Sequence, residues 1–175
     1  MSVIMKDNGE IFLQESKYPI STPFVPDVPS PRIGDIYGGG IVISTNPKII
    51  VSTENIVKIP WGCDGSYLGA TGITVGTGKL NTSIICSLCP TEVIAARVCV
   101  NYSGGGYTDW YLPSVGEMGL IYNMRNTIGG FINYWPYLTS TENTANYVAC
   151  YVFPNVGGGY TDKYNFYHFR PIRNY

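Results

Sequence analysis

The sequence predicts an α+β fold with two or three short helices, a small antiparallel sheet and long ordered loops. Ser114 and Glu117 stand in the S-x-x-E spacing of a capping box, which marks the start of a helix over about residues 115–125. The segment 60–80 holds six glycines and no sustained periodicity, which indicates a long loop. The last third of the chain contains three strand-like runs, at 137–142, 146–154 and 166–173.

The strand-like runs differ in their expected place in the sheet. The run at 146–154 is apolar on both faces, with Val148 and Cys150 on one face and aromatic residues on the other, so we expect a central strand. Pro171 interrupts the run at 166–173, so that strand should lie at an edge or end there.

Further elements are predicted upstream. The apolar runs 41–44 and 49–52 flank a turn and indicate a hairpin. Asn81 and Thr82 could cap a helix over 83–89.

Two more helical segments have an expected inner face. Thr91 could cap a helix over 92–102, and Ser114 caps the helix over 115–125. The residues expected to point inward are Val93, Ala96 and Val100 in the former and Val115, Met118 and Tyr122 in the latter. Gly116 and Gly119 each cost up to about 1 kcal/mol of helix stability, which a close approach to a neighbouring backbone would offset.

The N-terminal residues 1–31 are predicted to form an attachment arm, followed by a head domain at 32–175. Asn8-Gly9 between two apolar runs is a strong hairpin signal. Five prolines between residues 19 and 31 favour an extended spacer. A two-stranded hairpin is marginal alone in water, so its apolar residues should contact a partner, and we expect a homotrimer. These assembly residues are Ile4, Ile11, Phe12 and Leu13.

Composition limits the classes of partner. Charged residues make up 13% of the chain, against 21 glycines and 15 tyrosines, which is typical of a loop-rich surface domain. The high glycine content is equally consistent with a loop-rich fold that has no binding role. The net charge of −1 and the lack of a basic patch argue against nucleic acid. No apolar run reaches transmembrane length, so we expect no membrane insertion. No signal peptide is visible, so we expect synthesis and folding in a cytoplasm.

The five cysteines are expected to be mostly buried thiols. Their odd number excludes a complete disulfide framework within one chain. Cys86-x-x-Cys89 could be a redox or zinc site, but His168 is the single histidine that could help to complete it. We therefore expect no metal and no cofactor.

Catalytic patterns are weak. A serine triad would have to use His168, which stands in an aromatic strand-like run where packing or hydrogen bonding is the simpler role. Carboxylates are scattered, and Glu117 already belongs to the capping box. We therefore expect no enzymatic activity.

Loop residues supply a candidate ligand site. Aromatic rings can stack on sugars, while carboxylates bind their hydroxyl groups. The hexapeptide GGGYTD at 104–109 recurs at 157–162, either by coincidence or as two similar loops at one end of the head. The candidate ligand-binding residues are Trp61, Asp64, Tyr67, Tyr107, Asp109, Tyr160 and Asp162. For Trp110 we expect core packing instead.

Three motifs resemble a known family. They are GYTDWYLPSVGEM at 106–118, YLTSTEN at 137–143 and FRPIRNY at 169–175. They are similar to the family named after the C-terminal domain of a collagen-like bacterial adhesin, which occurs in bacterial surface proteins and phage fibres. Leu138 departs from the family, which has Trp there. The resemblance implies a C-type-lectin-like head, and Arg170 and Arg173 would match the family's terminal arginines, pairing with carboxylates such as Asp109 or Glu142. The calcium-binding tripeptides of C-type lectins are absent.

Together these features predict a non-enzymatic phage virion fibre or decoration protein. Its arm would bind capsid or tail proteins, and its head would attach to a host-surface glycan or protein from the virion surface. The alternative is a bacterial surface or secreted adhesion domain. An enzyme with the fold of formylglycine-generating enzymes is a third, remote option.

Overall fold

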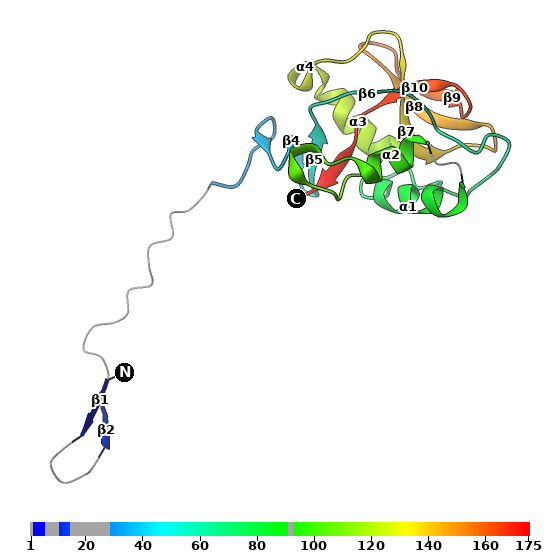
Figure 1. Ribbon diagram of the computed structural model, residues 1–175. Helices are drawn as coiled ribbons and strands as arrows, with labels where there is room; N and C mark the ends of the chain where they lie inside the picture. The colour runs from blue at the N-terminus through cyan, green and yellow to red at the C-terminus, as the bar shows by residue number, and fades with distance from the viewer. Residues whose placement is uncertain (1, 6–10, 15–28, 91–92) are drawn as a thin grey trace. The chain divides into compact units, whose positions relative to one another are not determined.

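The computed structural model describes residues 2–5, 11–14, 29–90 and 93–175 (Figure 1). Its contacts divide the chain into two units, Met1–Ser30 and Pro31–Tyr175. In the first unit, β1 (Ser2–Met5) pairs antiparallel with β2 (Ile11–Gln14). The two strands of the predicted hairpin are therefore present, while the Asn8-Gly9 turn and residues 15–28 lie outside the described residues.

The head is an α+β fold with two sheets and four α-helices in its described residues. The five-stranded sheet has the order β6 (Ile56–Pro60), β10 (Phe166–Phe169), β7 (Pro136–Glu142), β8 (Tyr147–Val152) and β9 (Gly157–Asp162). The four-stranded sheet has the order β11 (Ile172–Asn174), β5 (Lys48–Ser52), β4 (Gly40–Thr45) and β3 (Ile36–Tyr37).

The sheets are larger than the single small antiparallel sheet predicted from the sequence. β10 and β7 run parallel, so the five-stranded sheet is mixed. β8 is an interior strand, and β11 lies at a sheet edge after Pro171, as predicted. β9 was not predicted, because its glycine-rich sequence carries no strand signal.

The helices are α1 (Gly78–Leu88), α2 (Ala95–Asn101), α3 (Val115–Asn123) and α4 (Arg125–Ile128), with a 3-10 turn at Gly104–Gly106. The capping box of α3 is confirmed, because the Ser114 hydroxyl accepts a hydrogen bond from Glu117 N while Ser114 N donates to the Glu117 carboxylate. Met118 of α3 is fully buried, whereas Val115 and Tyr122 are only partly buried.

The predicted start of α1 was wrong, because both proposed capping residues lie inside the helix. Asn81 uses its amide to bind the backbone N–H and C=O of Gly72, at 3.0 and 2.7 Å. Thr82 binds the backbone of Leu112 through its hydroxyl. Both side chains therefore join the helix to distant segments instead of capping it.

The predicted inner face of α2 was also wrong in part. The helix begins at Ala95, and Ala95, Ala96 and Cys99 are its buried residues. Val93 and Val100 are 57% and 45% exposed. The small side chains of Ala95 and Ala96 join the same apolar core as α1, and this turns the predicted valine face outward. Thr91 lies outside the described residues.

Strand β7 contributes to two apolar cores. Leu138 points into a core shared with α1, α2 and β10, where Trp61 and Phe169 also lie. The neighbouring Tyr137 points into a second core, formed with α3 and the four-stranded sheet. Adjacent residues of a strand face opposite ways, so β7 contributes to both cores. Trp110 is 2% exposed, which confirms its predicted packing role.

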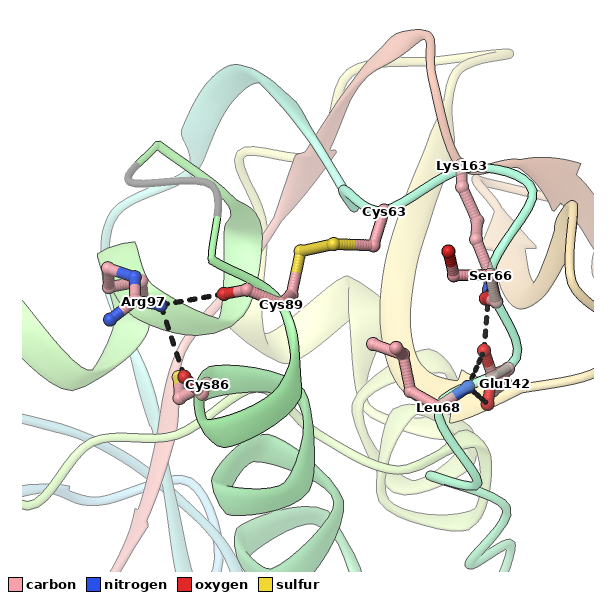
Figure 2. Close-up of a disulfide and its surroundings, with 8 residues drawn as sticks. All are labelled: Cys63, Ser66, Leu68, Cys86, Cys89, Arg97, Glu142 and Lys163. Atoms are coloured by element: carbon pink, nitrogen blue, oxygen red, sulfur yellow. Dashed lines mark hydrogen bonds and ion pairs between the residues drawn. A yellow bond between two sulfur atoms is a disulfide. The ribbon is translucent and has the colours of Figure 1, made fainter.

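The prediction of unpaired thiols is wrong for two of the five cysteines. Cys63 and Cys89 form a disulfide, which joins the loop 61–77 to the end of α1 (Figure 2). Cys86, Cys99 and Cys150 remain as thiols. Cys86 and Cys89 are therefore not a redox pair, and their spacing in the sequence gave no hint of the distant partner.

Candidate ligand-binding groove

A cavity of about 260 Å³ lies over β8 and β9, where β9 forms one edge of the five-stranded sheet. We call it the glycine groove. Its lining residues are Ile73, Val115, Thr141, Glu142, Asn143, Ala149, Gly158, Gly159 and Tyr160. Its volume is slightly below the range of typical small-molecule sites, so it suits one small ring or one side chain.

The strand register explains why the sheet is hollow here. Tyr160 pairs with Ala149, and Gly158 pairs with Tyr151. Residues two apart share a face, so Gly158, Tyr160 and Ala149 all belong to the face that lines the groove. Gly158 has no side chain and Ala149 only a methyl group, so backbone forms this part of the floor. The ring of Tyr151 borders it, 3.5 Å from the position that a Cβ on Gly158 would take. The ring of Tyr160, which is 67% exposed, stands beside that floor.

Ile73 and Val115 form an apolar wall of the groove, and backbone hydrogen bonds hold it. Gly116 N donates to Ile73 O at 2.9 Å, and the Ser114 hydroxyl donates to Thr74 O at 2.9 Å. A Cβ on Gly116 would lie 2.6 Å from Ile73 O, so this close approach requires glycine. The predicted compensation for a glycine in this helix is thus present at Gly116.

The buried carboxylate of Glu117 fixes the same wall from inside. It accepts hydrogen bonds from Ser114 N at 2.7 Å and Gly76 N at 3.0 Å, and from the Tyr111 hydroxyl. Burial raises the pKa of Glu117, although these hydrogen bonds oppose the shift. The residue is therefore a structural tie between α3 and the loop 61–77.

Glu142 also lines the groove, but its charge is paired within the protein. Its carboxylate is fully paired with Lys163, and both side chains are buried (Figure 2). It also accepts backbone hydrogen bonds from Leu68, Gly69 and Ala70. Because the Glu142 charge is paired with Lys163, the groups that the groove offers to a ligand are an aromatic ring, apolar side chains and the Asn143 amide.

Two of the predicted ligand residues, Tyr160 and Asp162, lie on β9. The second copy of the repeated hexapeptide is therefore a strand, not the predicted loop. Asp162 accepts hydrogen bonds from Asn165 and from the Tyr167 hydroxyl, the latter at 2.7 Å. It pairs across the sheet with Tyr147, which is 51% exposed and lies on the groove face.

Two further predicted residues lie on a neighbouring loop. Tyr67 is 60% exposed. Asp64 accepts a hydrogen bond from the Asn146 amide, and Gly65 N donates to Ala145 O. The loop at 64–67 therefore contacts the turn between β7 and β8, which also contains the groove residue Asn143.

Trp61 is not available to a ligand, which corrects its prediction as a stacking residue. It is fully buried, and its indole N–H donates to Thr139 O at 2.9 Å. The ammonium group of Lys163 lies 4.7 Å from the centre of its ring. The glycine-rich sequence around Trp61 suggested a surface loop. Instead, residues 61–62 are buried, beside the Cys63–Cys89 disulfide and Lys163.

Tyr107 and Asp109 belong to a different part of the head. Arg173 Nε donates a hydrogen bond to the Asp109 carboxylate at 2.6 Å. The guanidinium carbon of Arg173 lies 3.9 Å from the centre of the Tyr107 ring. Although partial burial opposes it, pairing with Arg173 lowers the pKa of Asp109. The predicted pairing of Arg173 with a carboxylate is confirmed. The two copies of the hexapeptide are a 3-10 turn and a strand, so they are not similar loops.

Sequence reasoning missed most of the groove. Ile73, Val115, Asn143 and Ala149 carry no local sign of a site, because tertiary contacts alone bring them together. His168 packs against the rings of Trp135 and Tyr137, as expected. No group of three potential metal ligands occurs within the described residues.

Comparison with known proteins gives a distant structural match. No protein-family model and no curated protein matches the chain. The chain resembles the crystal structure of a fimbrial protein from Bacteroides ovatus ATCC 8483, with a TM-score of 0.52 and 16% sequence identity. The match covers 73% of this chain but only 36% of the fimbrial chain. At this identity it shows a shared fold, and it assigns no family.

The wall of the groove can be tested with two glycines of the same helix. Gly116→Ala should lower the free energy of unfolding by about 1–3 kcal/mol, because the new methyl group meets the backbone of Ile73. Gly119→Ala should be neutral or stabilising by up to about 1 kcal/mol, because its nearest neighbour is the movable end of Tyr151. Urea unfolding measures both. Equal stability of the two variants would contradict the described wall.

Proposed function

We propose that this protein is a surface adhesion protein whose head binds its ligand in the glycine groove. The observation that carries this proposal is an exposed ring, Tyr160, beside a backbone floor on an edge strand. Exposed aromatic side chains next to concave surfaces are typical of binding sites. The fold similarity to a fimbrial protein supports the same class of role.

The Cys63–Cys89 disulfide supports an exported location over the virion first predicted. Disulfides persist mainly outside the cytoplasm, in secreted and cell-surface proteins. The bacterial surface or secreted adhesion domain is therefore the favoured version of the proposal. A phage fibre or decoration protein remains the second candidate, because the sequence motifs resemble a family found in both settings.

The ligand we propose is a glycan or a surface protein, held by a C-type-lectin-like head without calcium. Tyr160 would stack on a sugar ring or an apolar side chain, and the Asn143 amide would bind its polar edge. Because the Glu142 charge is already paired, an uncharged part of the ligand suits the groove.

Substitution of Tyr160 tests the groove. Tyr160→Ala should weaken binding to glycan arrays and to target cells by about tenfold or more, because a large contact ring is lost. Tyr164 is 62% exposed but does not line the groove, so Tyr164→Ala is the matched control and should bind normally. Equal binding by both variants, with unchanged folding, would remove the groove from the proposal.

The arm is proposed to mediate assembly. Its strands β1 and β2 carry Ile4, Ile11, Phe12 and Leu13, apolar residues that favour contact with a partner chain.

A shortened chain that begins at Arg32 tests the arm. It should fold, because the head forms its own contact unit, but it should sediment as a monomer where the full chain sediments as a trimer. It should also fail to join surface fibres or, for the second candidate, virions. Normal assembly of the shortened chain would contradict the proposed role of the arm.

A further inference from the structure

A second cavity, of about 270 Å³, lies beside α4 and is separate from the glycine groove. We call it the α4 pocket. Its lining residues are Arg125, Asn126, Gly129, Gly130, Phe131, Asn133, Phe153 and Pro154. The side chains include one guanidinium and two amides, and no carboxylate. Its polar groups are therefore rich in hydrogen-bond donors.

A buried arginine stands behind one wall of the pocket. Arg170 is 1% exposed, and its Nη2 donates to Gly129 O at 2.7 Å. The same nitrogen lies 3.0 Å from the position that a Cβ on Gly130 would take. The Gly129–Gly130 backbone is thus a thin layer between the guanidinium and the pocket.

Within the described residues, Arg170 has no carboxylate partner, which corrects the predicted pairing. Its hydrogen-bond acceptors are Asn55 Oδ1 at 2.6 Å and Gly129 O, while its Nη1 has no partner. Burial lowers the pKa of Arg170, and Tyr137, which is no carboxylate, is what opposes that shift. A charge in a poorly polarisable interior is weakly screened, so it acts on the pocket behind the glycines.

The aromatic wall adds to this positive character. The ring of Phe131 stacks on Phe153 with centroids 4.0 Å apart, and the Arg170 guanidinium lies 4.2 Å from the ring centre. Phe153 and Arg170 therefore cover the two faces of the Phe131 ring, and the ring lines the pocket with its edge. The edge of an aromatic ring carries partial positive charge.

Arg125 can contact a ligand directly. Its Nη1 donates to Tyr122 O at 2.9 Å, and its guanidinium stacks on the Tyr122 ring at 4.4 Å. These contacts fix the orientation of the group, and no other atom of Arg125 donates to an acceptor within the described residues. An oriented guanidinium edge matches the paired oxygens of a carboxylate or sulfate group.

We propose that the α4 pocket binds a small oxyanion, a carboxylate or sulfate group carried by a larger ligand. Arg125 binds the oxygens, the amides of Asn126 and Asn133 donate to them, and the unpaired charge of Arg170 favours the anion through the glycine wall. A cation is disfavoured by the same two guanidinium groups. A neutral ligand would leave the charge of Arg170 uncompensated.

Nuclear magnetic resonance of the ¹⁵N-labelled full chain tests the proposal. Sodium sulfate and sodium glucuronate should each produce saturable shifts at the amides of Gly129, Gly130 and Phe131 and at Arg125 Nε, with a dissociation constant of about 1–10 mM. Methyl glucoside, which is neutral, should produce none. A larger response to glucuronate than to acetate would show that the sugar ring adds contacts, whereas equal responses would identify the anion alone as the ligand.

Charge-removing variants separate this site from a general salt effect. Arg125→Gln should weaken binding about tenfold or more, because it removes a charge-assisted hydrogen bond. Lys79→Gln removes the same charge from the exposed surface of α1 and should leave the affinity unchanged. Absence of saturable shifts in the unmodified protein, or equal weakening in both variants, would overturn the proposal.

Discussion

The ion pair and hydrogen bonds of the buried Glu142 carboxylate are the interactions on which the glycine-groove end of the head depends. The carboxylate joins three separate segments, because it stands at the end of β7, accepts the backbone N–H groups of Leu68, Gly69 and Ala70, and pairs with Lys163 just after β9. A buried charge is costly unless its oxygens are fully hydrogen-bonded, and here they are. The loop 61–77, which has no helix or strand of its own and is mostly exposed, is thereby fixed to the body of the head (Figure 2).

The same loop is held at two further points, and together these ties shape the groove. The Cys63–Cys89 disulfide holds its beginning on α1. Glu117 and the backbone of Gly116 hold its second half against the start of α3, which places Ile73 in the wall. Two acidic residues thus hold this loop in place by accepting its backbone hydrogen bonds. Both carboxylates are hydrogen-bonded within the protein. Tyr160 and the glycine floor are therefore the parts of the groove that would select a ligand.

The sequence predicted correctly those elements that depend on interactions between residues close together in the chain. The capping box of α3, the hairpin of β4 and β5 and the interior position of β8 were all predicted, because each depends on neighbouring residues. Asn81, Thr82 and Trp61 were misplaced, since long-range hydrogen bonds decide their roles. β9 was missed because three glycines carry no strand preference, yet the register with β8 makes it a strand. Of the groove, the sequence indicated Tyr160 through its exposed residue type, and it could not indicate Ile73 or Val115.

Hydrogen exchange at the amides of Leu68, Gly69 and Ala70 tests the central role of Glu142 most directly. Loop amides exposed to water exchange rapidly, whereas amides bonded to a buried acceptor exchange only when the structure opens. These three amides should therefore be protected about as strongly as those of β7 and β8, and Lys163→Met should weaken their protection far more than that of the Gly76 amide, which Glu117 binds. Rapid exchange of the three amides in the unmodified protein, at the rate of an unstructured peptide, would contradict this account.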